Sequence, residues 1–182
     1  KNMTDIGKFN AVSNFSGYIL TVDDDITYPH DYIERMISEV DFHDRNCLIG
    51  VHGAVLPTGP AITRWSDYSL MRRSHVFETH SFSTFGVNVI GTGTLAYHTD
   101  VGVIPWDKFD HGRMVDLHMA VWCQENNIPM KLVSRKRKWL IEINEELEDR
   151  IWQTVNVDKE LQWQMIHVLM RCKQWKLLPE TE

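Results

Sequence analysis

The sequence has no surplus of positive charge and no metal-binding cysteine pattern. Its 182 residues include 19 Lys and Arg against 25 Asp and Glu, which gives a formal net charge of −6. A nucleic-acid-binding protein needs a basic face to neutralise phosphates, so this balance argues against a nucleic acid as the partner. The cysteines, Cys47, Cys123 and Cys172, form no CxxC pair, which argues against a structural zinc site.

Long apolar runs are also missing. No stretch approaches the length of a membrane span, and no signal-peptide pattern is visible. An odd number of widely spaced cysteines is typical of reduced thiols in a cytosolic protein. We therefore expect a cytoplasmic protein and leave open a peripheral attachment to the inner face of the membrane. Because the first residue is Lys, we expect the chain to be a fragment or a processed piece.

The apolar pattern that is present predicts an α/β protein. Residues 17–22 are a short β-rich apolar run, which indicates a buried strand. Pro29 introduces a predicted helix whose apolar residues recur at helical spacing between Tyr32 and Val40. Residues 47–51 follow as a second buried strand. Strand, helix and strand in this order predict a βαβ unit within an α/β sheet.

The rest of the chain continues as short elements without a clear domain boundary. We expect an irregular excursion over residues 53–85, where Pro57, Gly59 and Pro60 mark turns. The other predicted elements are strands at 87–90, 94–98 and 130–133, and helices at 114–126, 145–152 and 158–175. We therefore expect residues 1–182 to form a single domain.

The acidic triplet Asp23-Asp24-Asp25 comes directly after the first predicted strand. Ligand sites of open α/β sheets lie outside the carboxyl ends of strands. Three adjacent carboxylates repel one another unless a cation lies between them, and oxygen ligands suit Mg²⁺ or Mn²⁺. The alternative is a solvated acidic turn, but the buried strand before the triplet and the Tyr28-Pro29 turn after it favour the metal.

The stretch Gly17–Asp25 resembles the strand and DXD motif of family 2 glycosyltransferases with the GT-A fold. Asp5–Ala11 is similar to the loop and helix before that strand in the family. Gly50–Leu56 and Gly91–His98 resemble stretches of a bacterial branch that builds surface polysaccharides. The resemblance covers about residues 5–141 and implies a mixed sheet with flanking helices.

By this resemblance the chain is the metal-binding, acceptor-side part of a hexosyltransferase. The activity implied is metal-dependent and inverting, with a UDP-sugar as donor and a glycan as acceptor. Asp23 would lie near the ribose with Asp24, the variable middle position, beside it, and Asp25 would bind Mn²⁺ or Mg²⁺ together with Asp23. In the family two βα units that bind the nucleotide come first. They are missing from this sequence, so a further segment or a partner chain is expected to supply them.

Asp116 is the candidate base, at the start of the helix predicted at 114–126. An inverting transfer needs a base to take the proton of the attacking acceptor hydroxyl, and the family carries an acidic residue at such a helix start. Here Val115 stands where the family motif has the Glu of a Glu-Asp pair. The alternative is an ordinary carboxylate that favours a helix N-terminus.

Further binding residues are expected on both sides of the nucleotide. Arg135 and Arg137 belong to a basic run at 135–138 that could close over the diphosphate, although such a run is commonly a solvated edge. His98 or His52 could be a third metal ligand, although a lone His is more often structural. Trp65, Trp106 and Trp139 are candidate platforms for the acceptor.

Two other functions stay open at this stage. One is a retaining enzyme on the same fold. The other is a non-catalytic sugar-binding or assembly module that lacks donor binding on its own. The sequence specifies neither the sugar, the linkage nor the oligomeric state.

Overall fold

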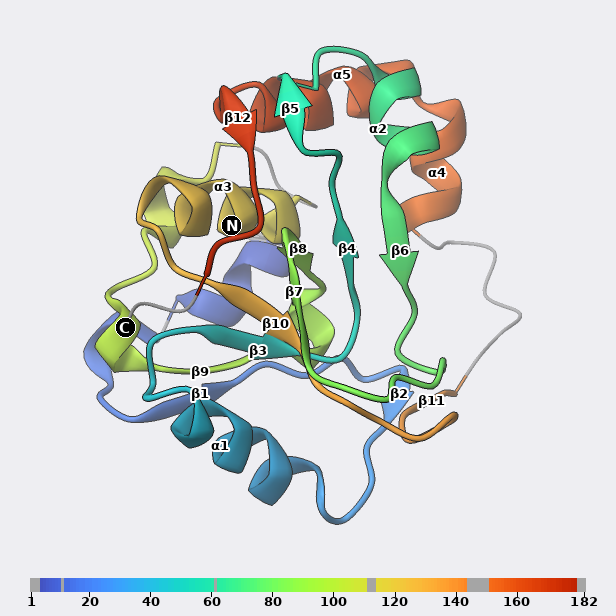
Figure 1. Ribbon diagram of the computed structural model, residues 1–182. Coiled ribbons are helices and arrows are strands. Elements are labelled where there is room, and N and C mark those ends of the chain that lie inside the picture. Colours follow the sequence, from blue (N-terminus) through green and yellow to red (C-terminus); the bar gives the residue numbers. More distant parts are fainter. Residues whose placement is uncertain (1–3, 11, 61, 111–113, 144–150, 180–182) are drawn as a thin grey trace.

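A mixed five-stranded sheet lies at the centre of the computed structural model, which describes residues 4–10, 12–60, 62–110, 114–143 and 151–179 (Figure 1). In spatial order its strands are β1 (Tyr18–Leu20), β9 (Ala96–His98), β3 (Leu48–Gly50), β10 (Met130–Leu132) and β7 (Phe85–Val87). β3 and β10 are parallel, whereas β9 is antiparallel to both β1 and β3, and β7 is antiparallel to β10. The prediction of an α/β protein with a mixed sheet is confirmed.

The predicted strand, helix and strand at the start of the chain are confirmed as β1, α1 (Tyr32–Phe42) and β3. They do not form a simple βαβ pair, because β9 inserts between β1 and β3. Burial explains the order: β9 is buried along its length, which suits a central position, whereas β1 is only half-buried, which suits an edge.

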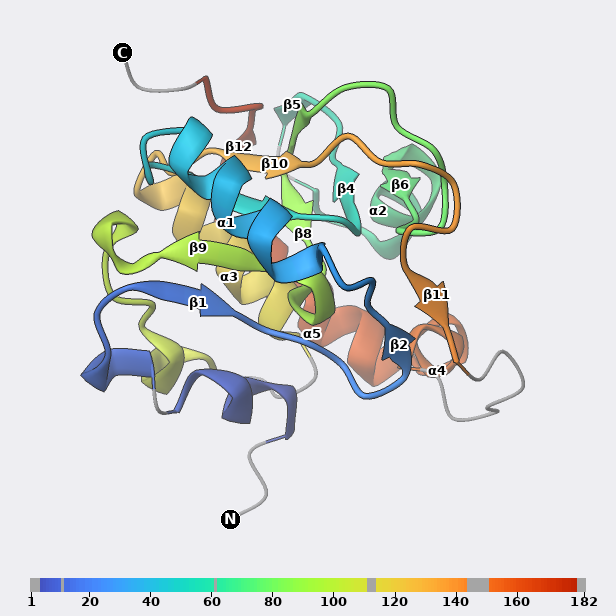
Figure 2. The same cartoon turned by 90° about the horizontal axis from the view of Figure 1, so that it is seen from below.

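Helices cover the two faces of this sheet. α1 packs against β9 and β3 and buries Tyr32, Met36 and Val40, which recur every four residues on one face (Figure 2). On the other face α3 (Val115–Glu125) is buried nearly all round, since it lies between β8 and α5 (Lys159–Leu169). A helix buried on this many sides is held in a fixed position, so α3 is a rigid support for its N-terminal residues.

Residues 53–85 were expected to be irregular, and this prediction is wrong. They contain β4 (Gly53–Val55), β5 (Gly59–Pro60), α2 (Trp65–Met71) and β6 (Arg73–His75). A three-stranded sheet has the order β6-β4-β8, with β8 at Val89–Ile90. These elements are too short to show a clear period in the sequence, and their partners come from distant segments.

The end of the chain also differs from the prediction. α5 stops at Leu169 instead of Trp175, and β12 (Gln174–Trp175) pairs with β5. Trp175 is almost fully buried in that pairing, which gives a physical reason for leaving the helix. α4 (Ile151–Val157) precedes α5, and most of the helix predicted at 145–152 lies outside the described residues.

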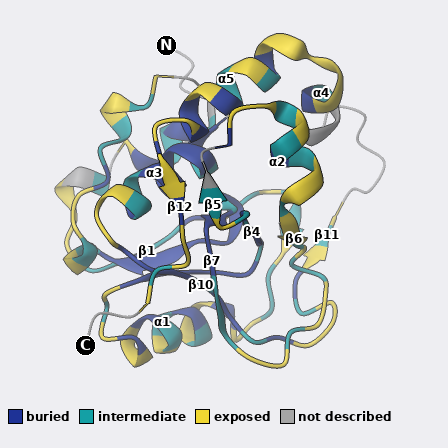
Figure 3. Ribbon diagram, turned by 45° about the horizontal axis from the view of Figure 1, so that its top comes forward, coloured by how far each residue is buried: buried dark blue, intermediate teal, exposed yellow. Residues whose placement is uncertain are grey.

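Short elements complete the architecture. Two-stranded pairing joins β2 (Ile26–Thr27) to β11 (Ile141–Glu142). The 3₁₀ helices are η1 (Thr4–Phe9), η2 (Val12–Asn14), η3 (Thr92–Thr94), η4 (Thr99–Val101) and η5 (Trp106–Lys108). Burial is concentrated in the central strands and in α3, while outer turns of α2 and α5 are exposed (Figure 3). All three cysteines are buried and unpaired. In the described ranges, no helix has both the length and the apolar character needed to cross a bilayer.

Candidate active site

A cavity of about 710 Å³ opens above the end of β1. One part of its lining, here called the acidic wall, consists of Asp5, Lys8, Asp23, Asp24, Asp25 and Asp116. A second part, the aromatic wall, consists of Trp65, Tyr68, Arg72, Val155 and Met165 from α2, the following residue, α4 and α5. Segments that are far apart in the sequence therefore meet around one space.

The segment Gly91–Thr94 forms the floor of the cavity between Asp23 and Asp116. Thr21 donates its hydroxyl hydrogen to the carbonyl of Thr92, and Thr94 Oγ1 accepts from the backbone N–H groups of Val51 and His52 at 3.2 and 3.1 Å. The segment is not a hairpin turn, since β8 pairs with β4 and β9 pairs with β1 and β3. It is a 3₁₀ turn fixed by side chains from both sides.

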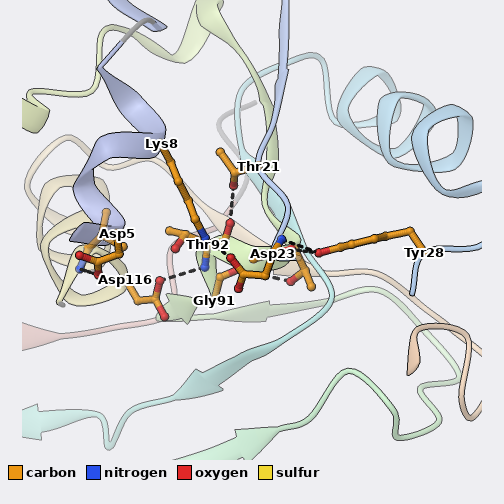
Figure 4. Close-up of polar contacts among 11 residues, drawn as sticks. Asp5, Lys8, Thr21, Asp23, Tyr28, Gly91, Thr92 and Asp116 are labelled. Atoms are coloured by element: carbon orange, nitrogen blue, oxygen red, sulfur yellow. Dashed lines mark hydrogen bonds and ion pairs between the residues drawn. The ribbon is translucent and has the colours of Figure 1, made fainter. Parts of the chain in front are cut away.

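Asp23 lies against this floor. Its carboxylate pairs with the Lys8 ammonium, and its backbone N–H donates to the hydroxyl of Tyr28 at 2.9 Å (Figure 4). That hydroxyl in turn donates to the carbonyl of Gly93 at 2.6 Å. A Cβ on Gly93 would lie 2.0 Å from Asp23 Oδ2, so only glycine lets the carboxylate occupy this position.

Asp24 and Asp25 follow at the mouth of the cavity. Asp24 is exposed and Asp25 is half-buried, and both line the cavity. The backbone carbonyl of Asp25 accepts a hydrogen bond from the Ile143 N–H at 2.7 Å, which ties the triplet to β11. Burial raises the pKa of Tyr28 to about 12, and the negative charges of Asp23 and Asp25 add to this shift.

Asp116 lies on the other side of the floor, in the first turn of α3. Its Oδ1 accepts a hydrogen bond from the Thr92 backbone N–H at 2.9 Å (Figure 4). Burial raises the pKa of the Asp116 carboxyl, and the neighbouring Asp5 adds to that shift, while the Thr92 hydrogen bond and Lys8 oppose it. Asp5 itself accepts from the Val115 N–H at 3.2 Å, which fixes the start of α3. Asp116 is thus a rigidly held carboxyl group with a raised affinity for a proton.

The structure does not bring His98 to the triplet. In the antiparallel β1–β9 pair, His98 is opposite Tyr18, at the far end of β1 from Asp23. Its Nδ1 lies 2.9 Å from the Asp100 carboxylate, and it does not line the cavity. The expectation of a metal ligand at His98 is therefore corrected. His52 does line the cavity, and its buried Nδ1 makes no hydrogen bond.

Arg135 is also in a different role from the one expected. It is 3% exposed, and its guanidinium donates to the backbone carbonyls of Phe77, Val133 and Val76 at 3.1, 3.2 and 3.0 Å. Those bonds use the donors that a diphosphate would need, so the assignment of Arg135 to donor binding is corrected. Arg137 is exposed and does not line the cavity.

Among the tryptophans, Trp65 lines the cavity, whereas Trp139 packs beneath the Arg35 guanidinium at 4.5 Å and Trp106 packs against the main core. Sequence reasoning missed the roles of Lys8, Tyr28 and Arg72. Lys8 lies in the Asp5–Ala11 block and Tyr28 in the turn after the triplet, so both were within recognised stretches. Arg72 had no signal, because residues 53–85 showed no period.

In the described part of the chain, no three or more His, Cys, Asp or Glu side chains gather as a metal-binding group. The oxygen donors of Asp23, Asp24 and Asp25 nevertheless fit an ion such as Mg²⁺. That ion is commonly held by one or two carboxylates together with substrate phosphates, and a full protein cage is not needed.

Comparison with known proteins gives no match, either among protein-family models or among curated sequences.

Proposed function

We propose that the chain is part of a glycosyltransferase that moves a hexose from a nucleotide-diphosphate sugar to a glycan acceptor. The observation that carries this proposal is the placement of Asp23 and Asp116 on opposite sides of the Gly91–Thr94 floor, within one cavity. The resemblance to family 2 enzymes supports it as well, and the mixed sheet is compatible with the GT-A fold. A cytoplasmic location belongs to the same proposal.

The acidic triplet would hold the divalent ion. Asp25 and Asp23 are the side chains suited to this, since both line the cavity and offer carboxylate oxygens. A bound Mn²⁺ or Mg²⁺ would supply Lewis-acid stabilisation of the charge that develops on the leaving diphosphate. Lys8 is the cation beside Asp23, and it keeps that carboxylate oriented toward the Gly93 floor.

Asp116 would act as the general base in an inverting transfer. Its held position at the N-terminus of α3 is suited to accept the proton of an acceptor hydroxyl. The raised pKa makes the carboxylate a better proton acceptor than an exposed Asp, as long as it stays ionised. Acidification protonates the carboxylate and would remove that ability.

The test is a donor screen by calorimetry on the intact protein, with and without Mn²⁺. We expect a UDP-sugar to bind in the presence of Mn²⁺ and to bind much more weakly without it. Asp25→Asn should remove most of the metal-dependent part, and Asp31→Asn, an exposed carboxylate outside the cavity, is the matched control. Binding that is equal with and without metal, and equal in Asp25→Asn, would refute the proposal.

A further inference from the structure

Arg72 is a cation in the cavity lining that no carboxylate of the described residues neutralises. Lys8 and Arg72 are the Lys and Arg side chains among the described lining residues, and Lys8 is paired with Asp23. The Arg72 guanidinium carbon lies 4.5 Å from the centre of the Tyr68 ring, and its Nε donates to Ser74 Oγ at 3.3 Å. A guanidinium has five N–H donors, so several remain for a ligand in the cavity.

An aromatic surface adjoins this cation. Trp65 and Tyr68 lie on α2 with ring centres 5.5 Å apart, and both rings belong to the cavity lining. Val155 of α4 and Met165 of α5 extend the apolar surface. Aromatic rings of this kind pack against the C–H faces of sugars while a polar group beside them fixes the orientation.

The same wall lies next to Asp116. Asp116, Trp65 and Arg72 all line the one cavity. A ligand that fills this cavity therefore faces both the Arg72 guanidinium and the Asp116 carboxylate.

We propose that the acceptor is an acidic glycan, and that Arg72 binds the carboxylate of a hexuronic acid residue packed on Trp65, while the buried Tyr68 ring supports the guanidinium from below. This inference rests on the proposed function, because it assigns the acceptor of that reaction. A single unpaired guanidinium matches the single charge of a carboxylate, and it can bind its two oxygens side by side. A phosphate would bring a second negative charge toward the acidic wall, where the described residues offer no further free cation.

The experiment measures binding of two probes to the intact protein by ligand-observed NMR titration. One probe is a disaccharide that contains glucuronic acid, and the other is its carboxyl-reduced counterpart, which has nearly the same shape without the charge. We expect the acidic disaccharide to bind about tenfold more tightly or better, as one charge-assisted contact allows. Arg72→Gln should abolish this preference. Arg73→Gln, the exposed neighbour outside the cavity, should keep it.

Arg72→Lys is the second variant if Arg72→Gln does not fold. It keeps the charge but loses the planar fork, so the preference should shrink without vanishing. Equal binding of the two disaccharides, no binding of the acidic one, or an unchanged preference in both variants would overturn the inference. Tighter binding of glucose 1-phosphate than of the acidic disaccharide would also overturn it, because the site would then prefer a phosphate group to a carboxylate.

The proposed function and the acceptor assignment can be refuted independently of each other. Hydrolysis of a UDP-sugar, in which water takes the place of the acceptor, releases the nucleoside diphosphate and the free sugar, and it reports the proposed function without a glycan. Donor turnover without a preference for the acidic disaccharide contradicts the acceptor assignment alone. A preference that depends on Arg72 in a protein that binds no nucleotide-sugar contradicts the proposed enzyme and retains the sugar-binding wall.

Discussion

The chain has two conspicuous runs of like charge, and the fold treats them in opposite ways. Asp23-Asp24-Asp25 lines the cavity, with Asp23 held by Lys8 and by the Gly93 floor. In the run at 135–138, Arg135 is buried among backbone carbonyls and Arg137 is exposed away from the cavity. Both runs were candidates for donor binding from the sequence; the structure places the acidic run at the cavity, and Arg135 and Arg137 do not line it.

The difference follows from where the hydrogen-bond partners lie. A guanidinium can donate to several carbonyls of an irregular loop at once. Arg135 therefore supplies hydrogen bonds to residues 76–79 that a strand or helix would otherwise supply. An ionised carboxylate has no hydrogen to donate to a carbonyl, so its partners must be N–H groups or cations. The N–H of Thr92 and the ammonium of Lys8 are the partners that hold Asp116 and Asp23 at the cavity.

The largest expected effect concerns Arg135. Arg135→Ala leaves the buried carbonyls of Phe77, Val76 and Val133 without the guanidinium, which should lower the free energy of unfolding by about 3 kcal/mol. That corresponds to a fall in Tm of roughly 6–12 °C for a chain of this size. Arg137→Ala is the matched control and should change stability by less than about 0.5 kcal/mol. Equal melting temperatures for the two variants would remove the contrast between buried and exposed arginine.

A second effect concerns His52, which lines the cavity and is affected by the charges of both Arg135 and Arg72. Burial lowers the pKa of His52 to about 4, and the positive charges of Arg135 and Arg72 contribute. The ring is neutral in the folded protein above that pH but protonates near 6.5 when unfolded. Stability is therefore fully present above pH 6.5 and is lost as the pH falls toward 4, by about 1–3 kcal/mol.

Thermal unfolding measured between pH 7 and pH 4 checks this sign. His52→Gln should show a flatter dependence of Tm on pH over that window than the wild type. His80→Gln changes an exposed histidine and should keep the wild-type dependence. The prediction is wrong if His52→Gln and the wild type lose stability in parallel.

Gly93 tests how the acidic wall is held. In Gly93→Ala the added methyl meets the end of the Asp23 side chain, so the carboxylate should swing away while the backbone stays in place. On our proposal, donor affinity should fall about tenfold, the loss of one charged contact, with little change in Tm. Gly86→Ala is the control, because its methyl would meet neighbours at 3.9 Å and beyond. Unchanged donor binding in Gly93→Ala would separate Asp23 from the donor site.

The sequence was informative where the signal is local. The strand before the triplet, the helix with Tyr32, Met36 and Val40, and the start of α3 near Asp116 follow from apolar periodicity and turn residues. The pairing of β9 with β1 has no local signal, and this antiparallel pairing is what carries His98 away from Asp23.

Contacts across the chain were the part that could not be predicted. Lys8 meets Asp23, and Thr92 meets Asp116, only after the sheet and α3 have assembled. The carbonyls that bind Arg135 belong to a loop without a pattern, so a buried structural arginine and a diphosphate-binding arginine are identical in the sequence. Short elements between residues 53 and 75 were missed for the same reason.

The central claim is that Asp116 is the base of a transfer reaction in the cavity of the acidic triplet. The measurement that tests it most directly is kcat of Asp116→Asn together with its Tm. Asn keeps an oxygen that accepts from Thr92 N–H and removes a half-buried carboxyl group whose pKa is raised, so stability above the pKa of the unfolded carboxyl should be equal or higher. Turnover should fall by about a hundredfold or more, with donor affinity nearly unchanged. Near-normal turnover in a well-folded Asp116→Asn would contradict the account and leave Asp116 as a structural partner of Thr92.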